Sequence, residues 1–109
     1  MALPYPPKDH NIKLADAARL TKAFRDNPSR PSVKAVAVDR GIIDDILKQN
    51  DCQGLRCYFA LDDDGTQTLV FVGIDSKGND MYNGVLAENT WPCPPVCDDA
   101  VISNSPLNK

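Results

Sequence analysis

Apolar and β-branched residues concentrate between Gly54 and Met81, in two runs that are separated by a short turn. The first run is Gly-Leu-Arg-Cys-Tyr-Phe-Ala-Leu and the second is Thr-Gln-Thr-Leu-Val-Phe-Val-Gly-Ile. Asp-Asp-Asp-Gly joins them, and Asp-Ser-Lys-Gly follows the second run. Runs of this kind bounded by Asp and Gly are typical of antiparallel hairpins. The pattern therefore predicts a β-meander whose third strand returns through Met81 to Glu88.

The first turn fixes the register of the predicted hairpin. A type I turn with Gly65 in the left-handed conformation places Asp62 opposite Thr66, and the remaining pairs follow in step. Directly opposed residues share a face of the sheet. One face is then an apolar core face, made of Leu55, Cys57, Phe59, Leu61, Leu69 and Phe71. The other face is mixed and carries Arg56, Tyr58, Ala60, Thr68, Val70 and Val72.

Two helices and a short strand are predicted before the meander. Apolar residues recur at helical spacing over residues 14–26 and again over residues 40–49. Pro28 ends the first helix, because the residue before a proline is driven out of the helical region. Asp39 is the predicted N-cap of the second helix, and residues 33–38 read as a strand between the two. We expect the first helix to cover the apolar face of the sheet.

The resulting order, α-β-α-β-β-β, predicts an α+β fold with two helices packed on one face of a small antiparallel sheet. A chain of 109 residues fits one domain. The prolines of residues 1–11 predict an extended arm, residues 12–97 a single domain, and residues 98–109 a polar tail.

Composition narrows the classes of function. The formal net charge is −3 and the basic residues are scattered, so a nucleic-acid partner is not expected. No apolar run approaches the roughly 20 residues that a membrane span requires, so no membrane partner is expected. The first residues lack the charged and apolar regions of a signal peptide, which favours a cytoplasmic protein.

The sequence offers little support for catalysis. Its one histidine, His10, lies in the proline-rich arm, and there is no glycine-rich phosphate loop. The aspartates around Gly65 and Gly78 are explained by turn chemistry, without a calcium site. We therefore favour a non-catalytic interaction or accessory protein with a protein partner. The predicted contact residues are Arg56, Tyr58, Val70, Val72 and Trp91.

The four cysteines carry the alternative hypothesis, a structural zinc or thiol redox protein. Cys52 and Cys57 form one closely spaced pair, Cys93 and Cys97 another, and four thiolates can complete a zinc site. In the predicted register, however, Cys57 points into the core. Cys93 and Cys97 flank a Pro-Pro-Val loop and have three interpretations: reduced cysteines, a local disulfide, or a pair that binds metal or exchanges thiols. For a cytoplasmic chain the reduced form is favoured.

The chain also resembles a group of small uncharacterised bacterial proteins. The similar segments are Leu-Ala-Asp-Ala-Ala-Arg-Leu-Thr-Lys-Ala-Phe-Arg at 14–25, Ile-Ile-Asp-Asp-Ile-Leu at 42–47, Gly-Leu-Arg-Cys-Tyr-Phe-Ala-Leu-Asp at 54–62, Val-Gly-Ile-Asp at 72–75 and Cys-Pro-Pro-Val-Cys at 93–97. In that group a glycine often follows the last cysteine, where this chain has Asp98. The resemblance implies a compact soluble protein and transfers no catalytic residue.

Overall fold

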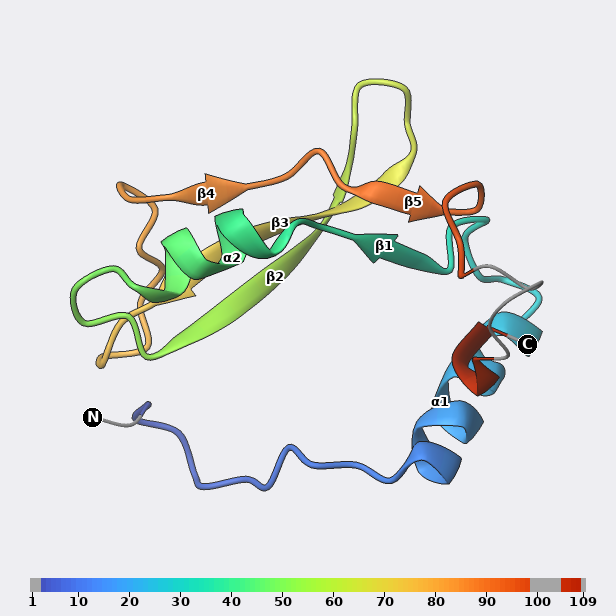
Figure 1. The fold of residues 1–109 in the computed structure, drawn as a ribbon, viewed down its shortest axis with the longest axis horizontal. Helices are drawn as coiled ribbons and strands as arrows, with labels where there is room; N and C mark the ends of the chain where they lie inside the picture. The colour runs from blue at the N-terminus through green and yellow to red at the C-terminus, as the bar shows by residue number, and fades with distance from the viewer. Residues whose placement is uncertain (1–2, 99–104, 109) are drawn as a thin grey trace.

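The computed structural model describes residues 3–98 and 105–108 and confirms the predicted α+β fold (Figure 1). Most of the polar tail predicted at 98–109 therefore lies outside the described residues. In chain order the elements are α1 (Leu14–Asp26), β1 (Ala35–Ala37), α2 (Arg40–Leu47), β2 (Gly54–Leu61), β3 (Gln67–Ile74), β4 (Leu86–Ala87), β5 (Trp91–Cys93) and the 3-10 helix η1 (Pro106–Asn108).

The β2–β3 hairpin has the predicted register. Leu61 pairs with Gln67 and Phe59 with Leu69, and the antiparallel pairing continues to the far end of both strands. Gly65 has a φ of 80°, and its N–H donates to the carbonyl of Asp62 at 2.9 Å. The left-handed glycine thus closes the turn as its sequence predicts.

The third strand is shorter than the predicted Met81–Glu88. β4 contains two residues, which pair with Phe71 and Val72, and β2, β3 and β4 form one sheet in that order. The N–H of Gly84 donates to the carbonyl of Met81 at 3.0 Å, which closes an extra turn before β4. Residues 81–84 therefore form a turn, whereas the sequence pattern predicted that they extend the strand.

A second, two-stranded sheet joins β1 to β5, with Ala35 opposite Cys93 and Ala37 opposite Trp91. The sequence pattern predicted no strand at residues 91–93, and β5 contains Pro92. A proline is tolerated at the edge of a sheet, where its missing N–H has no partner to lose. Each of these two short strands has only one neighbour, so the proline is accommodated.

The core lies between α2 and the β3–β4 half of the sheet. Ile46 of α2 is fully buried and packs with Phe71 and Ala87. The close approach is visible at Gly73, where an added methyl group would lie 2.9 Å from the sulfur of Cys52. β2 takes little part in this core.

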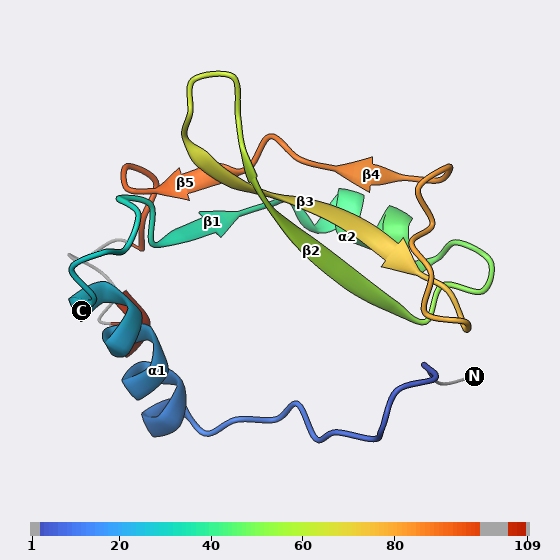
Figure 2. The same ribbon diagram turned by 180° about the vertical axis from the view of Figure 1, so that it is seen from behind.

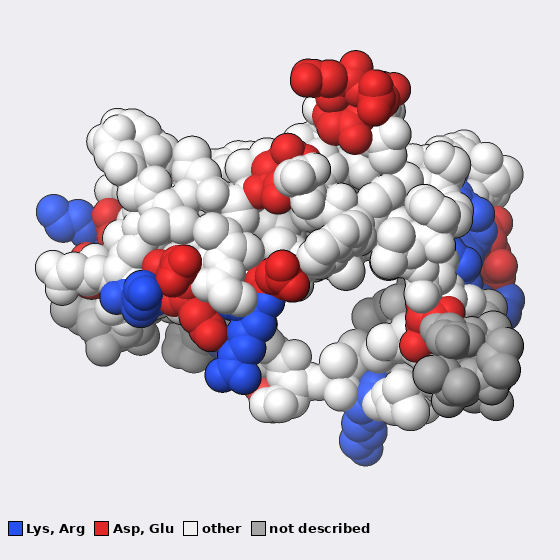
Figure 3. Space-filling model, turned by 45° about the horizontal axis from the view of Figure 1, so that its top comes forward, with Lys and Arg blue, Asp and Glu red and all other residues white. Residues whose placement is uncertain are grey.

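The helix α1 has the predicted bounds but not the predicted position. It lies beside η1, and the guanidinium of Arg25 donates to the carbonyl of Leu107 at 2.6 Å (Figures 1 and 2). α1, which is described along its whole length, buries no side chain fully. The space-filling view shows an opening between α1 with its preceding arm and the sheet (Figure 3). The radius of gyration is accordingly 15.7 Å, against about 13 Å for a compact chain of this length.

Because α1 does not cover the sheet, the predicted core face is only partly buried, and its prediction was wrong for β2. Phe71 is buried, but on β2 the side chains of Phe59 and Leu61 are 85 % and 73 % exposed, and Cys57 is exposed as well. Alternation along the strand predicted correctly which residues share a face. It did not determine that the buried core under α2 forms on β3 and β4, while Phe59 and Leu61 of β2 stay exposed.

Candidate functional site

The mixed face of the sheet carries a hydrogen-bonded cluster centred on Arg56. Its guanidinium donates to Asp80 Oδ1 at 2.5 Å and to the hydroxyl of Tyr5 at 2.5 Å. The hydroxyl of Tyr58 donates to the other carboxylate oxygen of Asp80. Arg56 and Tyr58 are thus brought together as predicted, but by Asp80 and Tyr5, which the sequence did not single out. The alternation of β2 gave no signal for either partner.

These contacts shift the pKa values of the cluster. The hydrogen bonds from Tyr58 and Arg56 lower the pKa of Asp80 below its ordinary value. The same bond to Asp80 raises the pKa of Tyr58. The cluster therefore combines a carboxylate, a guanidinium and a neutral phenol at neutral pH. Each of these groups is hydrogen-bonded to a neighbour, which fits a structural role better than that of a general acid or base. We call this cluster of Tyr5, Arg56, Tyr58 and Asp80 the clasp.

The clasp holds the start of the N-terminal arm against the mixed face. A methyl group added to Gly54 would lie 3.1 Å from the side chain of Leu3, and one added to Gly78 would lie 2.8 Å from the hydroxyl of Tyr5. The hydroxyl of Tyr5 also donates to the carbonyl of Gly78 at 3.2 Å. This chain's own arm therefore occupies one end of the face that was predicted to bind a partner.

Three further predicted contact residues fit the prediction poorly. Val72 is only 3 % exposed, which leaves little of its side chain for a partner to contact. Val70 is half-buried. Trp91 remains half-exposed but belongs to β5, in the other sheet.

The opposite face of β2 presents four apolar side chains that no described part of the chain covers fully. We call this set the β2 strip, and its members are Leu55, Cys57, Phe59 and Leu61. β2 is also an edge strand of its sheet. Partial burial raises the pKa of the Cys57 thiol, so it stays protonated at neutral pH and poorly nucleophilic. The strip is therefore an apolar surface without reactive groups.

Acidic side chains gather at the tip of the β2–β3 hairpin (Figure 3). One carboxylate oxygen of Asp62 accepts the backbone N–H groups of Asp64 and Thr66, each at 2.9 Å. This is the turn chemistry that the sequence predicted. Within residues 3–98 and 105–108, no three His, Cys, Asp or Glu side chains are grouped closely enough to hold a metal ion.

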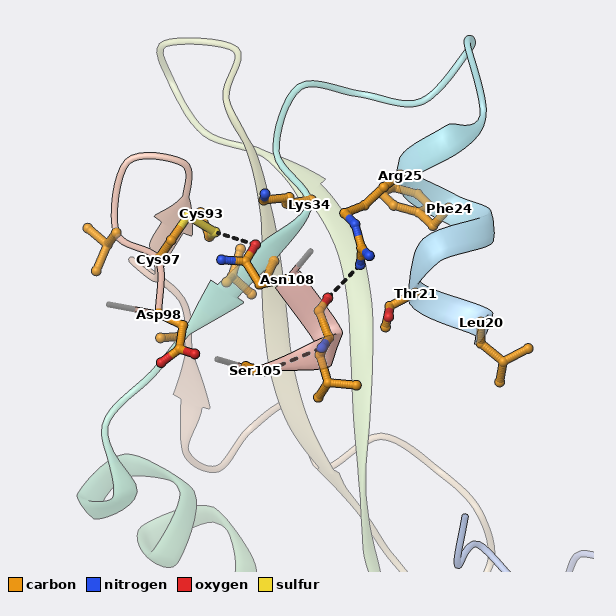
Figure 4. A pocket seen from close by; sticks show the side chains of 15 residues that line it. Leu20, Thr21, Phe24, Arg25, Lys34, Cys93, Cys97, Asp98, Ser105 and Asn108 are labelled. Carbon is orange, nitrogen blue, oxygen red and sulfur yellow. Dashed lines mark hydrogen bonds between the residues drawn. A yellow bond between two sulfur atoms is a disulfide. The ribbon is translucent and has the colours of Figure 1, made fainter. Parts of the chain in front are cut away.

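Cys93 and Cys97 form a disulfide with a Cα separation of 4.8 Å (Figure 4). This replaces the favoured interpretation of two reduced cysteines. Cys93 is a buried residue and Cys97 an exposed one, so the bond ties a loop at the surface to the β1–β5 sheet. Cys52 lies apart from them, against the core, where its sulfur contacts the carbonyl of Gly54 at 3.3 Å. The arrangement does not gather the cysteines into the alternative zinc site.

A cavity of about 530 Å³ lies beside the disulfide, between α1, β1 and η1 (Figure 4). Leu20 and Phe24 line it from α1, and Val36 lines it from β1. Both α1 side chains are about half-exposed, so the cavity is an open apolar groove. Lys34 reaches its rim.

Comparison with known proteins gave no match to this chain among family models, curated proteins or solved structures. Among the residues that the structure describes, no helix is both long and apolar enough to cross a membrane. The resemblance to small bacterial proteins thus stays a prediction, and function has to be argued from the surfaces described above.

Proposed function

We propose that this protein is a small non-catalytic interaction module that binds a protein partner through the β2 strip. One observation carries the proposal: Phe59 is 85 % exposed in the middle of a strand that pairs with β3 along its whole length. Covering a Phe or Leu side chain contributes roughly 1.5–3 kcal/mol. Adjacent exposed apolar side chains that form a continuous patch are typical of an interaction site.

This proposal moves the contact from the mixed face to the apolar one. Arg56 and Tyr58 already have partners within the chain, and breaking the clasp to bind another protein would leave the carboxylate of Asp80 without its donors. The β2 strip carries no such cost. Tyr58, about half-exposed, can still contribute at the margin.

Site-specific photo-crosslinking tests the proposal. A photoreactive phenylalanine replaces Phe59, and the control places the same residue at Leu14, which is exposed on α1. Cells that express either variant are irradiated, and the adducts are identified by mass spectrometry. We expect protein adducts at position 59 that are at least several-fold enriched over position 14. Equal yields at the two positions would contradict the proposal.

A second candidate function is thiol–disulfide exchange, which the exposed position of residue Cys97 favours. An incoming thiolate would attack the sulfur of Cys97 and form a mixed disulfide, and Cys93 would leave as a thiolate. In a Cys93→Ser variant, Cys97 is a free thiol that should attack a partner's disulfide, release the partner's other sulfur as a thiolate and stay trapped in the mixed disulfide, which is visible on a non-reducing gel. A variant that stays free of adducts when mixed with proteins that carry an accessible disulfide would argue against exchange.

The cytoplasmic location and the zinc alternative both remain proposals that need reduced cysteines. Disulfides persist in oxidising compartments and are rare in the cytosol, so the Cys93–Cys97 bond weighs against both. Alkylation of free thiols in intact cells, followed by mass spectrometry, tests whether the four cysteines are reduced there. Four alkylated cysteines support the cytoplasmic proposal, and alkylation of Cys52 and Cys57 alone contradicts it.

A further inference from the structure

We propose that the partner of the β2 strip is a second copy of this chain, with the two β2 strands paired antiparallel about a two-fold axis at Tyr58. This inference rests on the proposed function and names its occupant. Pairing of this kind would join the two three-stranded sheets into one six-stranded sheet.

Within the described part of the chain, the free edge of β2 has unpaired backbone N–H and C=O groups at every second residue, as antiparallel pairing with another strand requires. The N–H of Asp62, just after β2, donates to the carbonyl of Thr66, just before β3, at 2.9 Å. On the other side of β3, away from β2, the carbonyl of Gly73 accepts a hydrogen bond from the N–H of Met81. Even-numbered residues of β2 therefore bond to β3, and odd-numbered residues point their N–H and C=O groups outward. These outward groups belong to the same residues that make up the β2 strip.

The side chains are self-complementary about Tyr58. With the axis there, Leu55 lies opposite the second copy's Leu61, and Cys57 lies opposite its Phe59. Each apolar side chain then meets an apolar neighbour on the same face, at the spacing of cross-strand pairs. The two Tyr58 residues face one another on the opposite face of the sheet.

The charges permit the same register. Arg56 is the one charged residue within β2, and it lies opposite Ala60 of the second copy. Asp62, just beyond the strand, lies opposite the second copy's Gly54. No like charges are placed directly opposite one another. β2 also lacks the lysines, prolines and bulges with which edge strands avoid pairing.

Other described segments lie near the β2 strip without covering it: Phe24 of α1 and Ala35 of β1 share a pocket of about 220 Å³ with Phe59, and Phe59 is still 85 % exposed. The start of the arm is fixed on the mixed face through Tyr5, and α1 is held to η1 through Arg25. Among homo-oligomers, two-fold dimers with isologous interfaces are also the commonest kind. These observations favour a second copy over an unrelated partner.

Light scattering coupled to gel filtration, on the full chain over a range of concentrations, tests the association. We expect a dimer that Phe59→Glu weakens by about 100-fold or more in its dissociation constant, as for the loss of a central contact. Leu14→Glu is the matched control, since it charges an exposed leucine outside β2 and should leave the dimer intact. A wild-type chain that stays single at every concentration up to its solubility limit overturns the proposal, as does a dimer that Phe59→Glu leaves unchanged.

Disulfide trapping tests the register without altering the apolar side chains other than Cys57. In a Cys57→Ser background, Tyr58→Cys places two cysteines about 4.5 Å apart across the axis in Cα separation, within the range of a disulfide. Ala60→Cys in the same background is the control, because its copies lie four residues out of step. We expect a covalent dimer for the first and none for the second. Equal trapping overturns the proposal, and this experiment decides even where Phe59→Glu fails to fold.

Failure of the self-pairing proposal can be distinguished from failure of the proposed interaction function. A single-chain protein that still crosslinks at position 59 to a different protein overturns self-pairing and leaves the interaction function in place. The absence of any enriched adduct at position 59 removes both.

Discussion

At the residue scale, Gly65 controls the turn on which the register of the hairpin depends. Its φ of 80° is unfavourable for any β-branched residue. We expect Gly65→Val to lower the free energy of unfolding by about 1–2 kcal/mol. Gly41→Ala is the matched control, because an added methyl group meets nothing within 4 Å there and α2 should gain stability. Equal melting temperatures for Gly65→Val and wild type would contradict the turn assignment.

Cys57 and Val72 should respond to substitution in the reverse of the order that the sequence suggests. Cys57 is exposed, so Cys57→Ser should change the stability of the single chain by about 0.5 kcal/mol or less. Val72 is 3 % exposed, and Val72→Ala removes two buried methyl groups at a cost of about 1.5–2.5 kcal/mol. Urea denaturation at low protein concentration measures both. A Cys57→Ser loss as large as that of Val72→Ala would restore Cys57 to the core.

These residues show what alternation can and cannot predict. Phe59 and Phe71 lie on the same face and have the same pattern around them, yet one is exposed and the other buried. Pairing is local and follows from the turn, whereas burial depends on where α2 lies. The Asp80 clasp was missed for a similar reason, since its members come from three separate segments.

At the element scale, the clasp that holds the arm should be sensitive to acid. The pKa of Asp80 in the folded state lies below its ordinary value of 3.8. A lowered carboxyl pKa contributes stability that is complete above the ordinary value and is lost as pH falls through the folded value. We therefore expect the arm to detach only below about pH 4, as followed by NMR signals of Tyr5. Asp80→Asn should detach the arm at neutral pH, and an arm that stays docked in this variant would refute the role of the carboxylate.

The β1–β5 ribbon should depend on its disulfide. In the chain-entropy account, a bond that closes a five-residue loop contributes about 2 kcal/mol. Cys93→Ser combined with Cys97→Ser should therefore lower stability by about that amount, and a reducing agent should do the same to the wild type. Thermal melts with and without reductant measure the effect. If the double variant has the same melting temperature as the wild type, this would support the interpretation that the sequence favoured, in which both cysteines are reduced and their loop is loosely packed.

At the scale of the whole molecule, the class of fold followed from the sequence and the arrangement of α1 did not. The order of elements and the bounds of α1 needed only periodicity and Pro28. Where the helix lies depends on contacts with η1, which comes from the far end of the chain. Local patterns carry no information about such a contact, so the opening between α1 and the sheet could not be predicted.

This arrangement predicts a sharp difference between two apolar residues that the sequence treats alike. Ile46 is fully buried between α2 and the sheet, whereas Phe24 of α1 is 41 % exposed beside the open groove. Ile46→Ala should lower the free energy of unfolding by about 2–5 kcal/mol, because it leaves a cavity in the core. Phe24→Ala should cost clearly less, about 1 kcal/mol, since much of its ring already meets water. Chemical denaturation of the single-chain Phe59→Glu form, with each change added to it, separates these effects from association. If Phe24→Ala proves as costly as Ile46→Ala, then α1 packs on the β2 strip in solution, and the surface proposed for partners is already occupied by this chain's own helix.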